Sequence, residues 1–112
     1  MTIIVADDDQ AILRLAAHVL RVQGHQVLEA ASGTEALRAA ERHAGPVHLL
    51  LTDVQMPELD GPAAWRLLSR QRPEAKVLFM SGAEQSVVEF NGSLLRKPFA
   101  LSELARRVEA AL

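Results

Sequence analysis

Three groups of polar residues in this chain could together carry out phosphoryl chemistry. They are the run Asp7-Asp8-Asp9, the single residue Asp53 and the pair Lys97-Pro98. Each group follows a short, mostly apolar run that is typical of a buried strand, at residues 3–6, 49–52 and 94–96. If these runs are neighbouring parallel strands, their carboxyl ends meet at one sheet edge. Carboxylates and an ammonium group would then share one site.

Carboxylates gathered at such an edge predict a metal ion. Each pair of charges 4 Å apart repels by about 4 kcal/mol at an effective dielectric constant of 20, so the cluster stays partly protonated or holds a cation. The chain has no cysteine, and oxygen ligands favour a hard ion. Mg²⁺ binds through one or two carboxylates together with waters and phosphate oxygens. We therefore predict Mg²⁺ as the cofactor, with Asp7 and Asp8 as its ligands.

Asp53 is the best candidate for a nucleophile, because it stands alone after the most apolar run, which is predicted to be the central strand. A carboxylate can attack phosphorus and form an acyl phosphate. Ser81 offers a hydroxyl and Lys97 a compact positive charge to the phosphoryl oxygens. In-line phosphoryl transfer needs little more than such positioning and charge neutralisation.

Each of these residues also has an ordinary structural explanation when taken alone. Aspartates suit the N-terminus of a helix, and we expect Asp9 to be a cap or first-turn residue only. Asp53 and Ser81 could be turn residues, and a single lysine such as Lys97 is most often solvated. Their joint placement at predicted strand ends is what favours one shared site.

The hydrophobic pattern alternates short strands with amphipathic helices, which is typical of a parallel sheet covered on both faces. We predict strands at residues 3–6, 26–30, 48–52, 76–80 and 94–96, with residues 83–93 weakly patterned. Ser32 is expected to begin the second helix as a capping residue, and Pro62 to lie in the first turn of the third. Gly24 should end the first helix, whereas Ala100 is a poor cap for the last.

Composition limits the class of protein. The 112 residues fit a single domain, residues 1–112. A net charge of −2 without a basic run argues against a nucleic-acid partner. No apolar stretch approaches the roughly 18 residues of a membrane span. The lack of cysteine suits a cytoplasmic protein and excludes disulfides and thiolate zinc sites.

Taken together, the motifs resemble the receiver domain of two-component response regulators over essentially the whole chain. The matching segments are residues 3–9, 49–57, 60–61, 78–82 and 97–99. The resemblance implies a doubly wound α/β fold of the flavodoxin-like type. Its five-stranded parallel sheet would have the order 2-1-3-4-5, with helices on both faces.

The resemblance also implies a role for each residue of the site. Asp53 would accept a phosphoryl group from a phosphohistidine of a sensor histidine kinase or a histidine phosphotransfer protein. Ser81 would be the switch hydroxyl, and Lys97 would pair with the phosphoryl group and precede a cis proline, Pro98. Such a protein is not an enzyme in the usual sense, since it catalyses only its own phosphorylation and dephosphorylation.

For the metal, the resemblance implies four ligands. Asp8 would bind Mg²⁺ directly and Asp7 largely through water, joined by Asp53 and the backbone carbonyl of Gln55. The positions of Gln55 and Ala83 would tune dephosphorylation.

Two departures from the family pattern affect the expected signalling surface. Leu94 replaces the aromatic residue that usually lies three positions before the lysine. The segment from Ser81 to Lys97 is also short, so we expect a shortened or irregular fourth helix near residues 85–90. The resemblance leaves the downstream target open and fits a monomer or weak homodimer. It fits a stand-alone protein, which Met1 mildly favours, or a domain of a hybrid kinase.

Three alternatives stay open at this point. A Mg²⁺-dependent phosphatase could use Asp53 as its nucleophile, although Gln55 cannot serve as the general acid that such enzymes place two residues later. A pseudo-receiver would keep the fold without being phosphorylated. A flavodoxin-like flavin binder would need a phosphate loop where residues 7–9 instead carry three negative charges.

Overall fold

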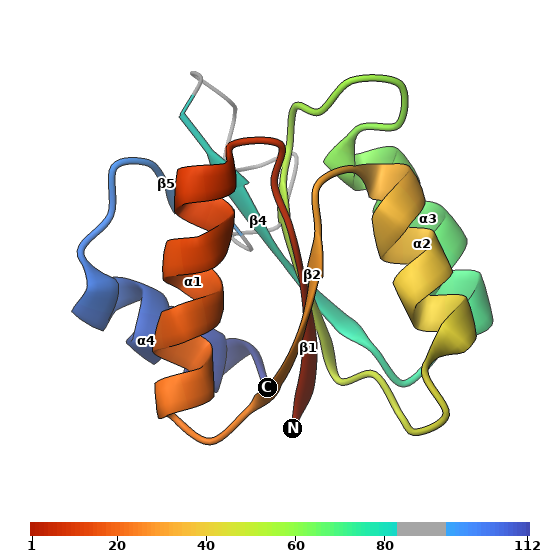
Figure 1. Cartoon of the computed structure of the whole chain (residues 1–112), viewed down its shortest axis with the longest axis horizontal. Coiled ribbons are helices and arrows are strands. Elements are labelled where there is room, and N and C mark those ends of the chain that lie inside the picture. Colours follow the sequence, from red (N-terminus) through yellow and green to blue (C-terminus); the bar gives the residue numbers. More distant parts are fainter. Residues whose placement is uncertain (83–93) are drawn as a thin grey trace.

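In a computed structural model of the chain, five parallel strands form one sheet that lies between two layers of helices (Figure 1). The structure describes residues 1–82 and 94–112. The strands are β1 (Thr2–Ala6), β2 (Gln26–Ala30), β3 (Leu49–Asp53), β4 (Lys76–Ser81) and β5 (Leu94–Arg96). Their order in the sheet is β2-β1-β3-β4-β5, which confirms the predicted doubly wound α/β fold.

The helices of the described residues cover both faces of this sheet. They are α1 (Gln10–Val22), α2 (Gly33–Arg42), α3 (Gly61–Gln71) and α4 (Leu101–Ala111). Figure 1 shows α1 and α4 on one side and α2 and α3 on the other. The short helix that we predicted near residues 85–90 lies outside the described residues. Within the described ranges, no helix is long and apolar enough to cross a membrane.

Local capping explains where the helices begin and end. Asp9, Ser32 and Asp60 each have extended backbone, and each side chain accepts a hydrogen bond from a backbone N–H two or three residues further on. Gly24, just after α1, has a φ of 95°, which glycine adopts at little cost. Ala100 precedes α4 without a side-chain cap. The roles predicted for Asp9, Ser32, Gly24 and Ala100 are confirmed, whereas the cap at Asp60 was not predicted.

Alternation along the central strands builds two separate cores. Ile3, Val5, Leu49 and Leu51 pack toward α1 and α4, whereas Ile4 and Leu50 pack toward α2 and α3. Every residue of β1 and β3 is buried, because helices cover both faces of the sheet. This burial fixes the direction and register of β3, and therefore the position of its last residue.

Arg72, directly after α3, ties the ends of α2 and α3 together. Its guanidinium group donates hydrogen bonds to the backbone carbonyls of Ala40, His43 and Gly45, at 2.8, 2.6 and 2.9 Å. Carbonyls at the C-terminus of a helix have no partner within the helix, so the bonds to Ala40 and His43 satisfy groups at the end of α2, and the bond to Gly45 holds the segment that follows. No local pattern in the sequence predicts this long-range cap.

Candidate functional site

The predicted site residues meet at the carboxyl edge of the sheet. Asp7 follows β1, Asp53 ends β3, Ser81 ends β4 and Lys97 follows β5. The registers Ala6–Thr52, Asp53–Met80 and Ser81–Arg96 bring these strand ends to the same level. An open pocket of about 390 Å³ lies above them. It is lined by Asp7, Asp8, Asp9, Ile12, Asp53, Gln55, Ser81, Gly82 and Lys97.

Three carboxylates in this pocket form a possible cation site. Asp7, Asp8 and Asp53 each offer one oxygen atom, and these atoms lie within 4.8 Å of one another. Asp7 and Asp53 are buried, whereas Asp8 is exposed. A cluster of hard oxygen donors that is open to water on one side fits the needs of Mg²⁺, which keeps part of its hydration shell. Asp9 instead caps α1, as expected.

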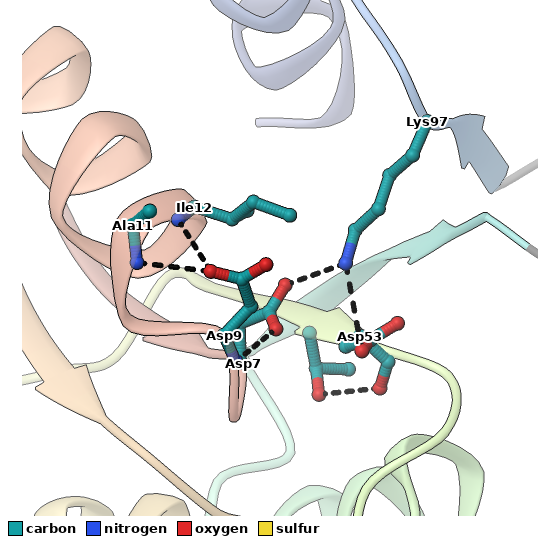
Figure 2. Close-up of polar contacts among 7 residues, drawn as sticks. Asp7, Asp9, Ala11, Ile12, Asp53 and Lys97 are labelled. Atoms are coloured by element: carbon teal, nitrogen blue, oxygen red, sulfur yellow. Dashed lines mark hydrogen bonds and ion pairs between the residues drawn. The ribbon is translucent and has the colours of Figure 1, made fainter.

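Lys97 reaches into the carboxylate cluster from the opposite wall of the pocket. Figure 2 shows its ammonium group between two carboxylates, with Nζ 2.7 Å from Asp7 Oδ2 and 3.5 Å from Asp53 Oδ2. The Lys97 side chain is only 16% exposed. The Lys97-Pro98 peptide bond is cis, as the resemblance implied. Lys97 therefore neutralises part of the negative charge in the pocket.

Burial and charge change the acidity of two of these groups. Burial, followed by repulsion from Asp7, raises the pKa of Asp53, although Lys97 acts in the opposite direction. For Lys97, burial alone would lower the pKa. The hydrogen bond to Asp7 and attraction to Asp7 and Asp53 outweigh this effect, so the pKa of Lys97 is raised. The lysine therefore stays charged, and Asp53 is harder to ionise than an exposed aspartate.

Hydrogen bonds to the backbone of residues 53 and 54 hold Asp53 in place. The hydroxyl of Thr52 donates to the carbonyl oxygen of Asp53 at 3.0 Å. On the next residue, the Val54 N–H donates to Met80 O and the Val54 carbonyl accepts from the Gly61 N–H, both at 2.9 Å. Neither Thr52 nor Gly61 was predicted to belong to the site, although Gly61 lies in one of the segments that match the family.

The remaining predicted residues are placed as follows. Ser81 and Gln55 both line the pocket, but Ser81 is buried and Gln55 is exposed. Leu94, at the position of the usual aromatic residue, is buried in a small apolar cluster with Val54 and Phe79. Ala83 lies outside the described residues.

A comparison with protein families identifies the family of this chain. The model of the response regulator receiver domain matches residues 3–109, nearly the whole chain. The chain belongs to this family. A receiver of similar length, the response regulator receiver protein CpdR of Brucella abortus (strain 2308), is 30% identical across 98% of this chain and 95% of CpdR.

Longer relatives contain a receiver as one segment. The sensor kinase CckA of Brucella abortus (strain 2308) is 36% identical across 99% of this chain, which spans only 12% of CckA. This receiver likewise spans 48% of the Bacillus subtilis regulatory protein PhoP, to which it is 30% identical. Receivers of this family therefore occur both nearly alone and within larger signalling proteins.

Solved structures agree with the family assignment. The receiver domain of the hybrid histidine kinase CckA is 37% identical and superimposes with a TM-score of 0.78, covering 100% of this chain and 99% of that domain. A receiver domain from Clostridium thermocellum is 28% identical with a TM-score of 0.85, covering 98% of this chain and 92% of the other.

Proposed function

We propose that this receiver accepts a phosphoryl group on Asp53 from a phosphohistidine, in a reaction that requires Mg²⁺. The observation that carries the proposal is the pocket itself. It holds three carboxylates whose oxygens lie within 4.8 Å of one another, with Lys97 against two of them. A buried carboxylate beside a cation site and an ammonium group suits in-line attack on phosphorus.

In the proposed reaction, a carboxylate oxygen of Asp53 attacks the phosphorus atom as the bond to the imidazole nitrogen breaks. The electron pair of that bond returns to the imidazole, which takes up a proton, and an acyl phosphate forms on Asp53. Lys97 and the Ser81 hydroxyl donate hydrogen bonds to the phosphoryl oxygens. Asp7, Asp8, Asp53 and the carbonyl of Gln55 would hold Mg²⁺, which offsets negative charge on the phosphoryl group when bound.

The proposed donor is a sensor histidine kinase or a histidine phosphotransfer protein. The likeness to the receiver segment of CckA supports a kinase as the partner. We propose further that residues 1–112 act as one receiver domain in the cytoplasm, as a monomer or weak homodimer. Such a domain catalyses only its own phosphorylation and dephosphorylation, and it signals by conformational switching or by passing the phosphoryl group on.

The test is a phosphorylation assay with small donors. The protein is incubated with Mg²⁺ and acetyl phosphate or phosphoramidate, and its intact mass is measured. We expect one phosphoryl adduct, lost in Asp53→Asn and after chelation of the metal. The absence of an adduct with either donor, together with no Mg²⁺ binding by calorimetry, would contradict the proposal and favour a pseudo-receiver.

A further inference from the structure

Gly61, the first residue of α3, lies directly against the backbone of Asp53. A methyl group built on its Cα would overlap the carbonyl oxygen of Asp53. The same methyl group would lie 3.1 Å from the Asp53 carbonyl carbon and 3.2 Å from Val54 Cα. Only hydrogen fits at this position, so α3 can begin here only with a glycine unless the backbone of Asp53 moves.

The backbone of Asp53 has little freedom to move away. Its carbonyl oxygen already accepts a hydrogen bond from the Thr52 hydroxyl, and the adjacent Val54 N–H donates to the carbonyl oxygen of Met80 on β4. Gly61 itself donates its N–H to the Val54 carbonyl at 2.9 Å. The backbone of residues 53 and 54 is therefore held by the sheet on one side and by the start of α3 on the other.

The start of α3 is also anchored. Asp60 caps the helix through a 2.9 Å hydrogen bond from the Ala63 N–H. One turn and two turns further on, Ala64 and Leu68 are fully buried, and Leu68 packs with Ile4 and Leu50 of the sheet. A larger residue at position 61 would thus displace the Asp53 peptide, the anchored helix, or both.

From this contact we infer that Gly61 is a positioning residue for the phosphoacceptor, an inference that rests on the proposed function. By carrying no side chain, it lets α3 fix Asp53 at its present distance from Lys97 Nζ, 3.5 Å, and within 4.8 Å of the other two carboxylates. Misplacing a reacting group by about 1 Å can lower a rate by about 100-fold.

Gly33 provides a matched control for this inference. A methyl group on Gly33 would lie 2.5 Å from the carbonyl oxygen of Leu59. The steric clash is of the same kind, because a methyl group again meets a backbone carbonyl of the segment that starts with Asp53 and ends before α3. It falls near the far end of that segment, however, and not on Asp53. Gly45 offers a milder control, because a methyl group there meets only the ring of His43, at 3.3 Å.

The experiment compares Gly61→Ala, Gly33→Ala and Gly45→Ala with the unmodified protein. Urea unfolding gives the stability of each variant, calorimetry gives its Mg²⁺ affinity, and intact mass gives its phosphorylation rate at saturating acetyl phosphate. We expect Gly61→Ala to lower the rate by about 100-fold and to weaken Mg²⁺ binding. Gly33→Ala should lose stability to a similar extent but keep most of the rate, and Gly45→Ala should match the unmodified protein.

Two results would overturn the inference. One is an unchanged rate and Mg²⁺ affinity in folded Gly61→Ala, and the other is an equal loss of rate in Gly61→Ala and Gly33→Ala. If Gly61→Ala does not fold, Thr52→Val removes the hydroxyl that holds the same carbonyl without adding bulk. We expect it to slow phosphorylation, and an unchanged rate would count against the inference. An unmodified protein that takes no phosphoryl group would refute the proposed function, and the Mg²⁺ affinities would still test the positioning role.

Discussion

Replacing Asp53 with asparagine should stabilise the folded protein at neutral pH when no divalent cation is present. In the folded chain, the Asp53 carboxylate is buried and lies close to two others, so its negative charge opposes folding. Asparagine has nearly the same shape but no charge. The substitution therefore isolates the electrostatic cost of keeping a carboxylate in this pocket.

The magnitude follows from the distances in the pocket. Oxygens of Asp7 and Asp8 lie within 4.8 Å of one from Asp53, so each repulsion is at least about 3.5 kcal/mol at an effective dielectric constant of 20. Attraction to Lys97 at 3.5 Å is about 4.7 kcal/mol on the same basis. Water screens the contribution of exposed Asp8, whereas burial of Asp53 adds to the cost. We expect asparagine to stabilise the protein by about 1 to 2 kcal/mol.

The gain should depend on pH in a defined direction. Because the pKa of folded Asp53 is raised, the folded protein keeps a proton on Asp53 at pH values where the unfolded chain has lost it. Below the ordinary aspartate pKa of about 3.9, both states are protonated and asparagine should give almost no gain. The gain should appear as the pH rises above that value and become constant above the raised pKa of folded Asp53.

Urea unfolding in the presence of a chelator measures this effect, with Trp65, the single tryptophan, as the fluorescence probe. The midpoint should rise at pH 7.5 without a change in slope, since the surface exposed on unfolding is unchanged. Asp60→Asn is the matched control, because asparagine caps a helix as well as aspartate does and Asp60 is exposed. A neutral or destabilising effect of Asp53→Asn at pH 7.5, or a gain that persists at pH 3, would refute the electrostatic reasoning.

Three further substitutions test other parts of the structure. Lys97→Gln leaves buried Asp7 without its 2.7 Å partner and should lower the unfolding free energy by about 3 kcal/mol with chelator present. Calorimetry should show that Lys97→Gln binds Mg²⁺ more tightly than the unmodified protein. An unchanged urea midpoint would contradict the stabilising role of the ion pair between Lys97 and Asp7. Arg72→Ala removes three hydrogen bonds at the end of α2 and should cost about 2 kcal/mol in urea without slowing phosphorylation. Arg72→Lys should recover only part of the loss, and full recovery would count against the guanidinium cap. Ala100→Ser should raise the thermal midpoint of unfolding by adding the missing cap of α4, worth about 1 kcal/mol, and a lower midpoint would argue against that cap.

The sequence was sufficient to predict which residues gather at the site. Short apolar runs mark the strands, and a parallel sheet brings their carboxyl ends to one edge, so Asp7, Asp53 and Lys97 could be expected to meet. The ends of the strands were predicted less accurately. Asp53 and Ser81 belong to β3 and β4, whereas the pattern placed both just after their strands, because polar side chains at a buried strand end resemble the start of a loop.

Finer features of the site depend on tertiary contacts that no local pattern encodes. Lys97 lies closer to Asp7 than to Asp53, although β3, which carries Asp53, lies between β1 and β5 in the sheet. The cap that Arg72 gives to α2 joins groups about 30 residues apart in the chain. Likewise, the contact of Gly61 with the Asp53 backbone exists only once α3 packs at the end of β3.

The most direct test of the central claim is to locate the phosphoryl group chemically. After reaction with Mg²⁺ and phosphoramidate, borohydride reduces an acyl phosphate to an alcohol and thus converts the modified aspartate to homoserine. Peptide mass analysis should find homoserine at position 53 and aspartate at positions 7 and 8. Homoserine at another position, or none in protein that binds Mg²⁺ and has reacted with the donor, would contradict the assignment of Asp53 as the phosphoacceptor.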